Sequence, residues 1–99
     1  MMIKGINNKE QSIIRSILNE YTSKYDFFYY GSRVKGNFRV LSDLDILIKS
    51  DSKVSLDDLE TLKMLFDNSN LPYVVNLVDY NNIDKDFYNL IKNDLVKAV

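Results

Sequence analysis

Residues 31–36 read Gly-Ser-Arg-Val-Lys-Gly and residues 42–48 read Ser-Asp-Leu-Asp-Ile-Leu-Ile, and these two segments decide the fold. An aromatic run at 27–30 precedes them and has the composition of a buried strand. The Gly-Ser pair ends that strand, because glycine allows a sharp turn and a close approach of the backbone to a ligand. Consecutive amides after such a glycine can donate to phosphate oxygens. The first segment therefore predicts a phosphate-binding turn and a short helix over 32–36.

The second segment opens with two aspartates, Asp43 and Asp45, separated by one residue. Residues i and i+2 of a strand lie on the same face, so both carboxylates point the same way while Leu44 and Ile46 point into the core. Adjacent carboxylates repel each other unless a cation lies between them. Oxygen ligands without sulfur or imidazole suit Mg²⁺ or Mn²⁺. A phosphate-binding turn beside such a metal site is suited to a nucleoside triphosphate.

Composition restricts the chemistry further. The chain has 99 residues and is expected to form a single domain, 1–99, with one core. It contains no cysteine and no histidine, which excludes thiolate nucleophiles, disulfides and the commonest general base. Metal-assisted phosphoryl or nucleotidyl transfer is one of the few reactions that work well with the remaining side chains.

The charge and hydropathy of the chain indicate its surroundings. The formal net charge of −1 argues against direct nucleic-acid binding, although Arg33, Lys35 and Arg39 cluster beside the proposed phosphate site. We find no signal peptide and no apolar run that could span a bilayer, so no membrane association is expected. The absence of cysteine suits a cytoplasmic protein.

The pattern along the chain alternates helices with strands. Asn8, with Gln11 in the capping-box position, is expected to open the first helix, and Ser55 with Asp58 the third. Strands are expected at 27–30, 43–49 and 73–79, and a last helix from about Asp84. The inner face of that last helix is expected to carry Phe87, Leu90, Ile91 and Leu95. The order α-β-α-β-α-β-α predicts a two-layer α/β domain with three strands and about four helices.

Gly31-Ser32, ten further residues and then Asp43-x-Asp45 resemble the minimal nucleotidyltransferase family, the smallest members of the DNA-polymerase-β-like superfamily. Arg33 also fits the usual Gly-Ser-Arg-x-x-Gly form of that family. The resemblance extends over nearly the whole chain and implies a nucleotidyltransferase fold with a small mixed sheet.

The resemblance also implies roles for these residues. Gly31 and Ser32 would bind the phosphates of ATP with Arg33 adding positive charge, and Asp43 and Asp45 would hold Mg²⁺ (or Mn²⁺) as the catalytic carboxylates. The family normally has a third carboxylate on a neighbouring strand.

The third carboxylate position departs from the family pattern. In this sequence it is Asn76, which can ligate a metal through oxygen but carries no charge and accepts no proton. Asp79 is the alternative third ligand if the strand register is shifted, but alternation places it on the opposite strand face from Asn76. Both assignments stay open at this point.

Two functions follow from the resemblance. The first is a Mg²⁺-dependent nucleotidyltransferase that transfers AMP from ATP to a partner protein, as the antitoxin of a pair with a helical protein of the HEPN type. The second is a catalytically weak or inactive nucleotide-binding module that occludes its helical partner, which Asn76 favours. The chain is expected to associate with a HEPN-type protein or with a copy of itself, because it has no room for an acceptor-binding domain.

Overall fold

The computed structural model describes residues 3–99, so residues 1–2 of the predicted domain lie outside the described part. The α-helices are α1, α2, α3 and α4, at Asn8–Leu18, Ser32–Lys35, Leu56–Asp67 and Lys85–Ile91. The strands are β1, β2, β3 and β4, at Asp26–Tyr30, Leu44–Lys49, Val75–Asp79 and Val96–Lys97. Single 3-10 turns η1, η2 and η3 cover Asn19–Tyr21, Tyr80–Asn82 and Lys92–Asp94.

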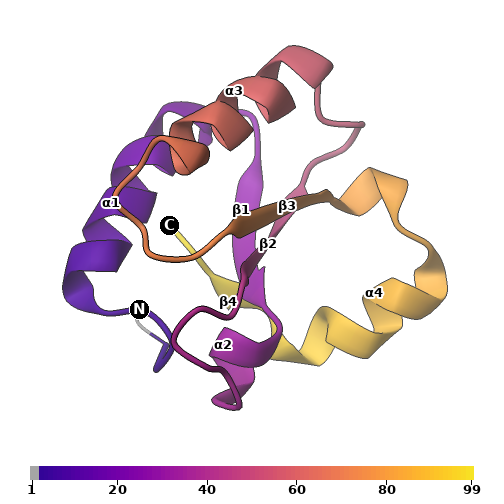
Figure 1. Ribbon diagram of the computed structural model, residues 1–99. Helices are drawn as coiled ribbons and strands as arrows, with labels where there is room; N and C mark the ends of the chain where they lie inside the picture. The colour runs from indigo at the N-terminus through magenta and orange to yellow at the C-terminus, as the bar shows by residue number, and fades with distance from the viewer. Residues whose placement is uncertain (1–2) are drawn as a thin grey trace.

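One mixed sheet lies at the centre of the molecule, with the strand order β3-β2-β1-β4 (Figure 1). β1 pairs antiparallel with both β2 and β4, whereas β2 and β3 run parallel. The predicted count of three strands is wrong by one. The fourth strand, β4, had no counterpart in the sequence prediction, and its residues 96 and 97 pair with Tyr29 and Phe28 of β1.

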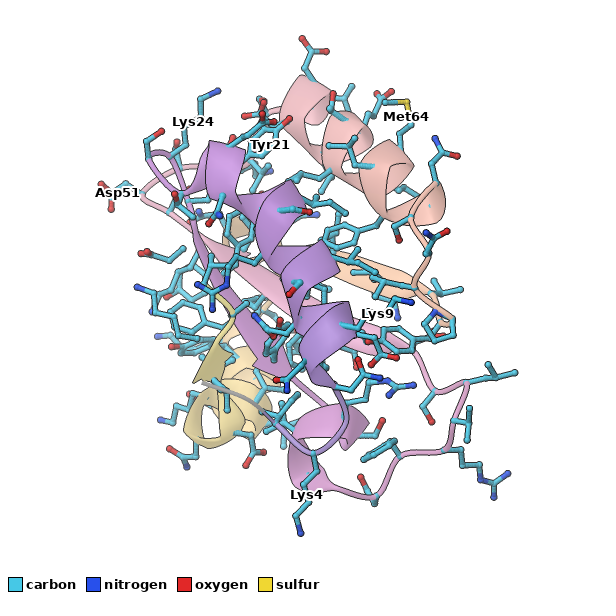
Figure 2. The ribbon with its side chains drawn as sticks, turned by 90° about the vertical axis from the view of Figure 1, so that its left-hand side faces the viewer. Lys4, Lys9, Tyr21, Lys24, Asp51 and Met64 are labelled. Atoms are coloured by element: carbon cyan, nitrogen blue, oxygen red, sulfur yellow. The ribbon has the colours of Figure 1, made fainter. Side chains whose placement is uncertain are left out.

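The predicted two-layer α/β architecture is confirmed. α1 and α3 lie side by side over one face of the sheet, as both views show (Figures 1 and 2). Aromatic and aliphatic side chains from these helices and the sheet bury one continuous core, which includes Ile14, Leu18, Phe27, Tyr29, Ile46, Ile48, Leu62 and Phe66. Figure 2 shows Lys4, Lys24 and Asp51 pointing outward at the periphery of the molecule.

The opposite face of the sheet is covered only in part, by α4. The ring of Phe87 meets the ring of Tyr30 edge to face, with centroids 6.1 Å apart. No residue of α4 is buried, and Leu90 is 76% exposed. The expectation that Leu90 lies on an inner face is therefore wrong, because α4 contacts the sheet through one edge. Within residues 3–99 no helix has the length and apolar composition needed to cross a bilayer.

Helix caps agree with the sequence at α3 and differ by one residue at α1. The Ser55 side chain accepts from the amide of Asp58, as expected. α1 is capped by Asn7, which forms a capping box with Glu10, and not by Asn8 with Gln11. Gln11 takes no part in the cap and instead lies in the core, where it is 6% exposed.

Gln11 joins three distant parts of the chain. Its Nε2 donates to the carbonyl of Ala98 over 2.9 Å, and its Oε1 accepts from the hydroxyl of Tyr29 over 2.6 Å. Burial raises the pKa of Tyr29 to about 12, so this hydroxyl remains a donor at neutral pH. The amide therefore satisfies the only polar atom of Tyr29's side chain inside an apolar layer.

We expect Gln11→Ala to lower the free energy of unfolding by about 1–3 kcal/mol, because it leaves the buried Tyr29 hydroxyl without its acceptor. Urea denaturation followed by circular dichroism measures this loss. Ser12→Ala, on the exposed side of the same helix, is the control and is expected to leave stability nearly unchanged. Equal stability of the two variants would contradict the structural role of Gln11.

Candidate active site

Asp43, Asp45 and Asn76 converge at the pair of parallel strands β2 and β3. Asp45 lies directly opposite Asn76 in the register, and Asp43 immediately precedes β2. The Asn76 Nδ2 donates to Asp43 Oδ2 and to Asp45 Oδ1, each over 3.1 Å. One amide group thus spans both carboxylates, at the position where the sequence placed a third ligand.

Asp79 lies elsewhere. It aligns with Ile48, and its carboxylate accepts from the amides of Val54 and Asn81, each over 2.9 Å. These bonds cap η2 and fix the segment before α3. The structure brings Asn76, and not Asp79, beside the two aspartates, as strand alternation requires.

The electrostatics of the site favour a cation. Burial raises the pKa of Asp45, the hydrogen bond from Asn76 opposes this, and the charge of Asp43 raises the pKa further. Burial, together with the charge of Asp45, also raises the pKa of Tyr30 to about 12. Each of these shifts arises because negative charge is held in a partly desolvated place, which a bound cation would relieve.

The Gly31 turn lies in direct contact with Asp45. Gly31 has φ +86° and ψ −159°, a region that side-chain-bearing residues almost never adopt. A Cβ at Gly31 would also collide with the Asp45 carboxylate. The backbone of the turn can approach the carboxylates this closely only because residue 31 is glycine.

The predicted short helix after the turn is confirmed as α2. The amides of Val34 and Lys35 both donate to the carbonyl of Gly31, and Gly36 ends the helix with φ +87°. The amides of Ser32 and Arg33 precede these bonds, so within the described chain no backbone carbonyl accepts from them. They are the donors that the turn can offer to an anion.

Arg33 differs from its predicted role of adding charge to the phosphates. Its side chain is buried, with 3% exposure, and its guanidinium donates to the carbonyls of Gly5, Val40 and Ser42 over 2.6–2.9 Å. The aromatic ring of Tyr73 lies under it, 3.8 Å from the guanidinium carbon. These partners occupy both the edge and one face of the group, which argues against phosphate binding by this side chain. The sequence shows that residue 33 is an arginine, but it does not show its hydrogen-bond acceptors, because they come from other segments of the chain.

The donor set fits magnesium carried in by a nucleotide. Two carboxylates and one amide converge, and Mg²⁺ is commonly bound through one or two carboxylates together with substrate phosphates. Among residues 3–99 no cluster of three or more acidic, histidine or cysteine side chains is placed to hold a metal by itself. Protein ligands alone would therefore bind the metal weakly.

Comparison with known proteins identifies the fold and the family. The family model described as "Polymerase beta, Nucleotidyltransferase" matches residues 11–96. The chain belongs to this family. The resemblance to nucleotidyltransferases noted in the sequence is thereby confirmed.

Two individual proteins are similar to the chain. It is 34% identical over 87 residues to the "Probable protein adenylyltransferase MntA" of Haemophilus influenzae, covering 88% of this chain and 76% of that protein. A crystal structure of a toxin–antitoxin with AMP-PNP superposes with a TM-score of 0.71 at 19% identity, covering 90% of this chain and 72% of the other. The second likeness shows that the folds are the same.

Gly31→Ala is expected to destabilise the protein by about 1–3 kcal/mol, because it combines a strained φ with the collision against Asp45. It should also weaken ATP binding, measured by calorimetry in the presence of Mg²⁺. Gly36→Ala is the matched control, since it has the same positive φ but no atom within 4 Å of its added Cβ. Gly36→Ala should lose stability and keep its ATP affinity. Unchanged ATP affinity in Gly31→Ala would show that the Gly31 turn does not bind the phosphates of ATP.

Asp45→Asn is expected to raise the melting temperature of the metal-free protein at pH 7. The folded-state pKa of Asp45 is raised, so its ionised form destabilises the fold at neutral pH and its neutral form does not. The advantage of the variant should shrink as the pH falls through the folded-state pKa, where the parent carboxyl is protonated as well. Thermal melts between pH 7 and pH 4 measure this. A variant that is less stable than the parent at pH 7 would contradict the assignment.

Proposed function

We propose that this chain is a magnesium-dependent nucleotidyltransferase that passes AMP from ATP to a hydroxyl group of a partner protein. The observation that carries the proposal is the convergence of Asp43, Asp45 and Asn76 beside the Gly31 turn. Membership of the family supports the reaction type, and the similarity to protein adenylyltransferase MntA supports a protein acceptor. ATP as the donor suits a cytoplasmic location.

Each residue has a role in this proposal. Asp43 and Asp45 hold the metal, and the Asn76 side chain turns its amide so that its oxygen, instead of its NH₂ group, faces the metal. A bound Mg²⁺ would neutralise the negative charge that develops on the reacting phosphates. The amides of Ser32 and Arg33 bind the terminal phosphates, and Gly31 lets the chain come close enough.

The transfer exchanges a phosphoanhydride bond of ATP for a phosphoester bond to the acceptor oxygen. The acceptor oxygen bonds to the α-phosphorus while the bond from that phosphorus to the bridging oxygen breaks, so pyrophosphate leaves. The hydroxyl proton is released to solvent, because Asn76 cannot accept it. The lost carboxylate should make transfer slower than in a site with three acids, since proton removal and binding of a second metal are both weakened.

A partner face adjoins the site. Val40, Leu41 and Val74 are 79%, 70% and 58% exposed, and the loop that carries the first two leads directly into Asp43. Exposed apolar side chains grouped beside a reactive site are typical of a protein–protein contact. We propose a helical HEPN-type protein as the partner, with self-association as the alternative.

The second candidate function is a nucleotide-binding module that occludes the partner without catalysis. The double hydrogen bond from Asn76 favours it, because the amide satisfies both carboxylates without any metal. The two functions differ in whether labelled AMP reaches the partner.

Asn76→Asp distinguishes these functions. Without metal the third carboxylate adds repulsion, so the variant should melt below the parent. With Mg²⁺ and ATP the order should reverse, because a ligand that binds only the folded state stabilises it. Transfer of AMP to a co-purified protein, followed with ATP radiolabelled at the α-phosphate, should increase.

Two controls accompany this experiment. Asp79→Asn should melt lower than the parent to the same extent with and without Mg²⁺ and ATP, because Asp79 only accepts from Val54 and Asn81. Asp43→Asn should abolish both the Mg²⁺ response and the label. If the parent melts identically with and without Mg²⁺ and ATP and labels no protein, neither candidate function holds.

A further inference from the structure

The guanidinium of Arg33 hydrogen-bonds two segments that are separate in the sequence. Its Nη1 donates to the Gly5 carbonyl over 2.6 Å, ahead of α1. Its Nε and Nη2 donate to the carbonyls of Ser42 and Val40 over 2.9 and 2.8 Å. The carbonyl of Ser42 belongs to the peptide that links directly to Asp43. One rigid planar group therefore fixes the backbone on which the first metal-binding aspartate stands.

The same guanidinium contacts the segment that leads into β3. Its carbon lies 3.8 Å from the ring centroid of Tyr73 and 5.1 Å from that of Phe38. Tyr73 is buried and is anchored through its hydroxyl, which donates to Glu10 over 3.1 Å. Tyr73 stands three residues before Asn76. The adjoining Val74 carbonyl accepts from the amide of Leu44, which follows Asp43.

We infer that Arg33, stacked on Tyr73, is a positioning residue that keeps Asp43 and Asn76 within reach of each other and of one metal ion. This inference rests on the proposed function. Arg33 links the segments that lead into β2 and β3, the first by hydrogen bonds and the second by stacking. Besides Arg33, the Leu44–Val74 hydrogen bond, the start of the β2–β3 pairing and the amide bridge of Asn76 hold the loop before Asp43 beside the segment before Asn76.

Only arginine meets these requirements. Lysine would carry the charge to the same place, but it is a point donor without the planar fork that reaches Gly5, Val40 and Ser42 together. The N-terminal segment also limits the space around Arg33. A Cβ at Gly5 would lie 2.5 Å from the Arg33 Cβ, so the N-terminal segment is pressed against this residue.

The test compares Arg33→Lys with a control of similar local damage. Tyr25→Phe removes a part-buried hydroxyl that donates to Asp58 over 2.5 Å, in a different part of the molecule. The first readout is made without metal, by nuclear magnetic resonance. Arg33→Lys should shift the side-chain amide signals of Asn76 and speed hydrogen exchange at the amides of Ser42 and Leu44. Tyr25→Phe should change neither.

The second readout is the affinity for Mn²⁺ in the presence of a non-hydrolysable ATP analogue, measured by electron paramagnetic resonance of the free ion. Loss of an outer support of a metal site commonly weakens metal binding by about tenfold to a hundredfold, and we expect that range for Arg33→Lys. ATP affinity in a chelator should stay unchanged, because the backbone amide of Arg33 is retained. Tyr73→Leu, which removes the stacked ring, should weaken Mn²⁺ binding in the same direction if Arg33→Lys does not fold.

Two outcomes overturn the inference. Unaltered Asn76 signals and Mn²⁺ affinity, with only a stability loss like that of Tyr25→Phe, would show that Arg33 merely stabilises the fold. A fall of ATP affinity in the chelator would show that Arg33 contacts phosphate directly. If the parent itself takes up no Mn²⁺, the proposed function fails, while the Asn76 signals and the exchange rates still decide whether Arg33 positions this loop.

Discussion

Repulsion between two carboxylates is the constraint around which this fold is built. Asp43, just before β2, and Asp45, within it, alternate with the buried residues Leu44 and Ile46, and one amide group bridges their two carboxylates. The parallel pairing of β2 with β3 brings the Asn76 amide between them, and the Gly31 turn crosses where only a hydrogen atom fits. The strand order, Gly31 and the Asn76 amide together allow two carboxylates to lie close to each other.

The elements that the sequence predicted well are those with local causes. A Gly-Ser turn after an aromatic run and a serine cap at Ser55 each depend on residues within a few positions, and both are found as expected. β4 could not be predicted, because two residues become a strand only when β1 offers an open edge. The exposure of Leu90 could not be predicted for the same reason. The spacing of apolar residues defines one face of the helix, but it does not show whether another element covers that face.

The spacing of the candidate site residues could be predicted from the sequence. The roles of individual residues could be predicted less well. Strand alternation favoured Asn76 over Asp79 but left both open, because a one-residue shift in register moves a side chain to the other face. The pairing of Asn76 with Asp45 in the structure decides between them. The setting of Arg33 was not predictable. A basic residue beside a phosphate-binding turn is naturally assigned to the phosphates, and its carbonyl partners lie up to 28 residues away.

The hydrogen bonds of residue 98 to β1 and α1 affect how the chain can fold. Ala98 is 2% exposed, its amide donates to Phe27, and its carbonyl accepts from Gln11. The packing of α1 and β1 is therefore complete only when residue 98 is in place. Folding cannot proceed piece by piece from the N-terminus, as it can between separate domains. Contacts this distant in sequence also slow the search for the native state. A nascent chain that lacks residue 98 would therefore carry α1 and β1 with an incomplete core.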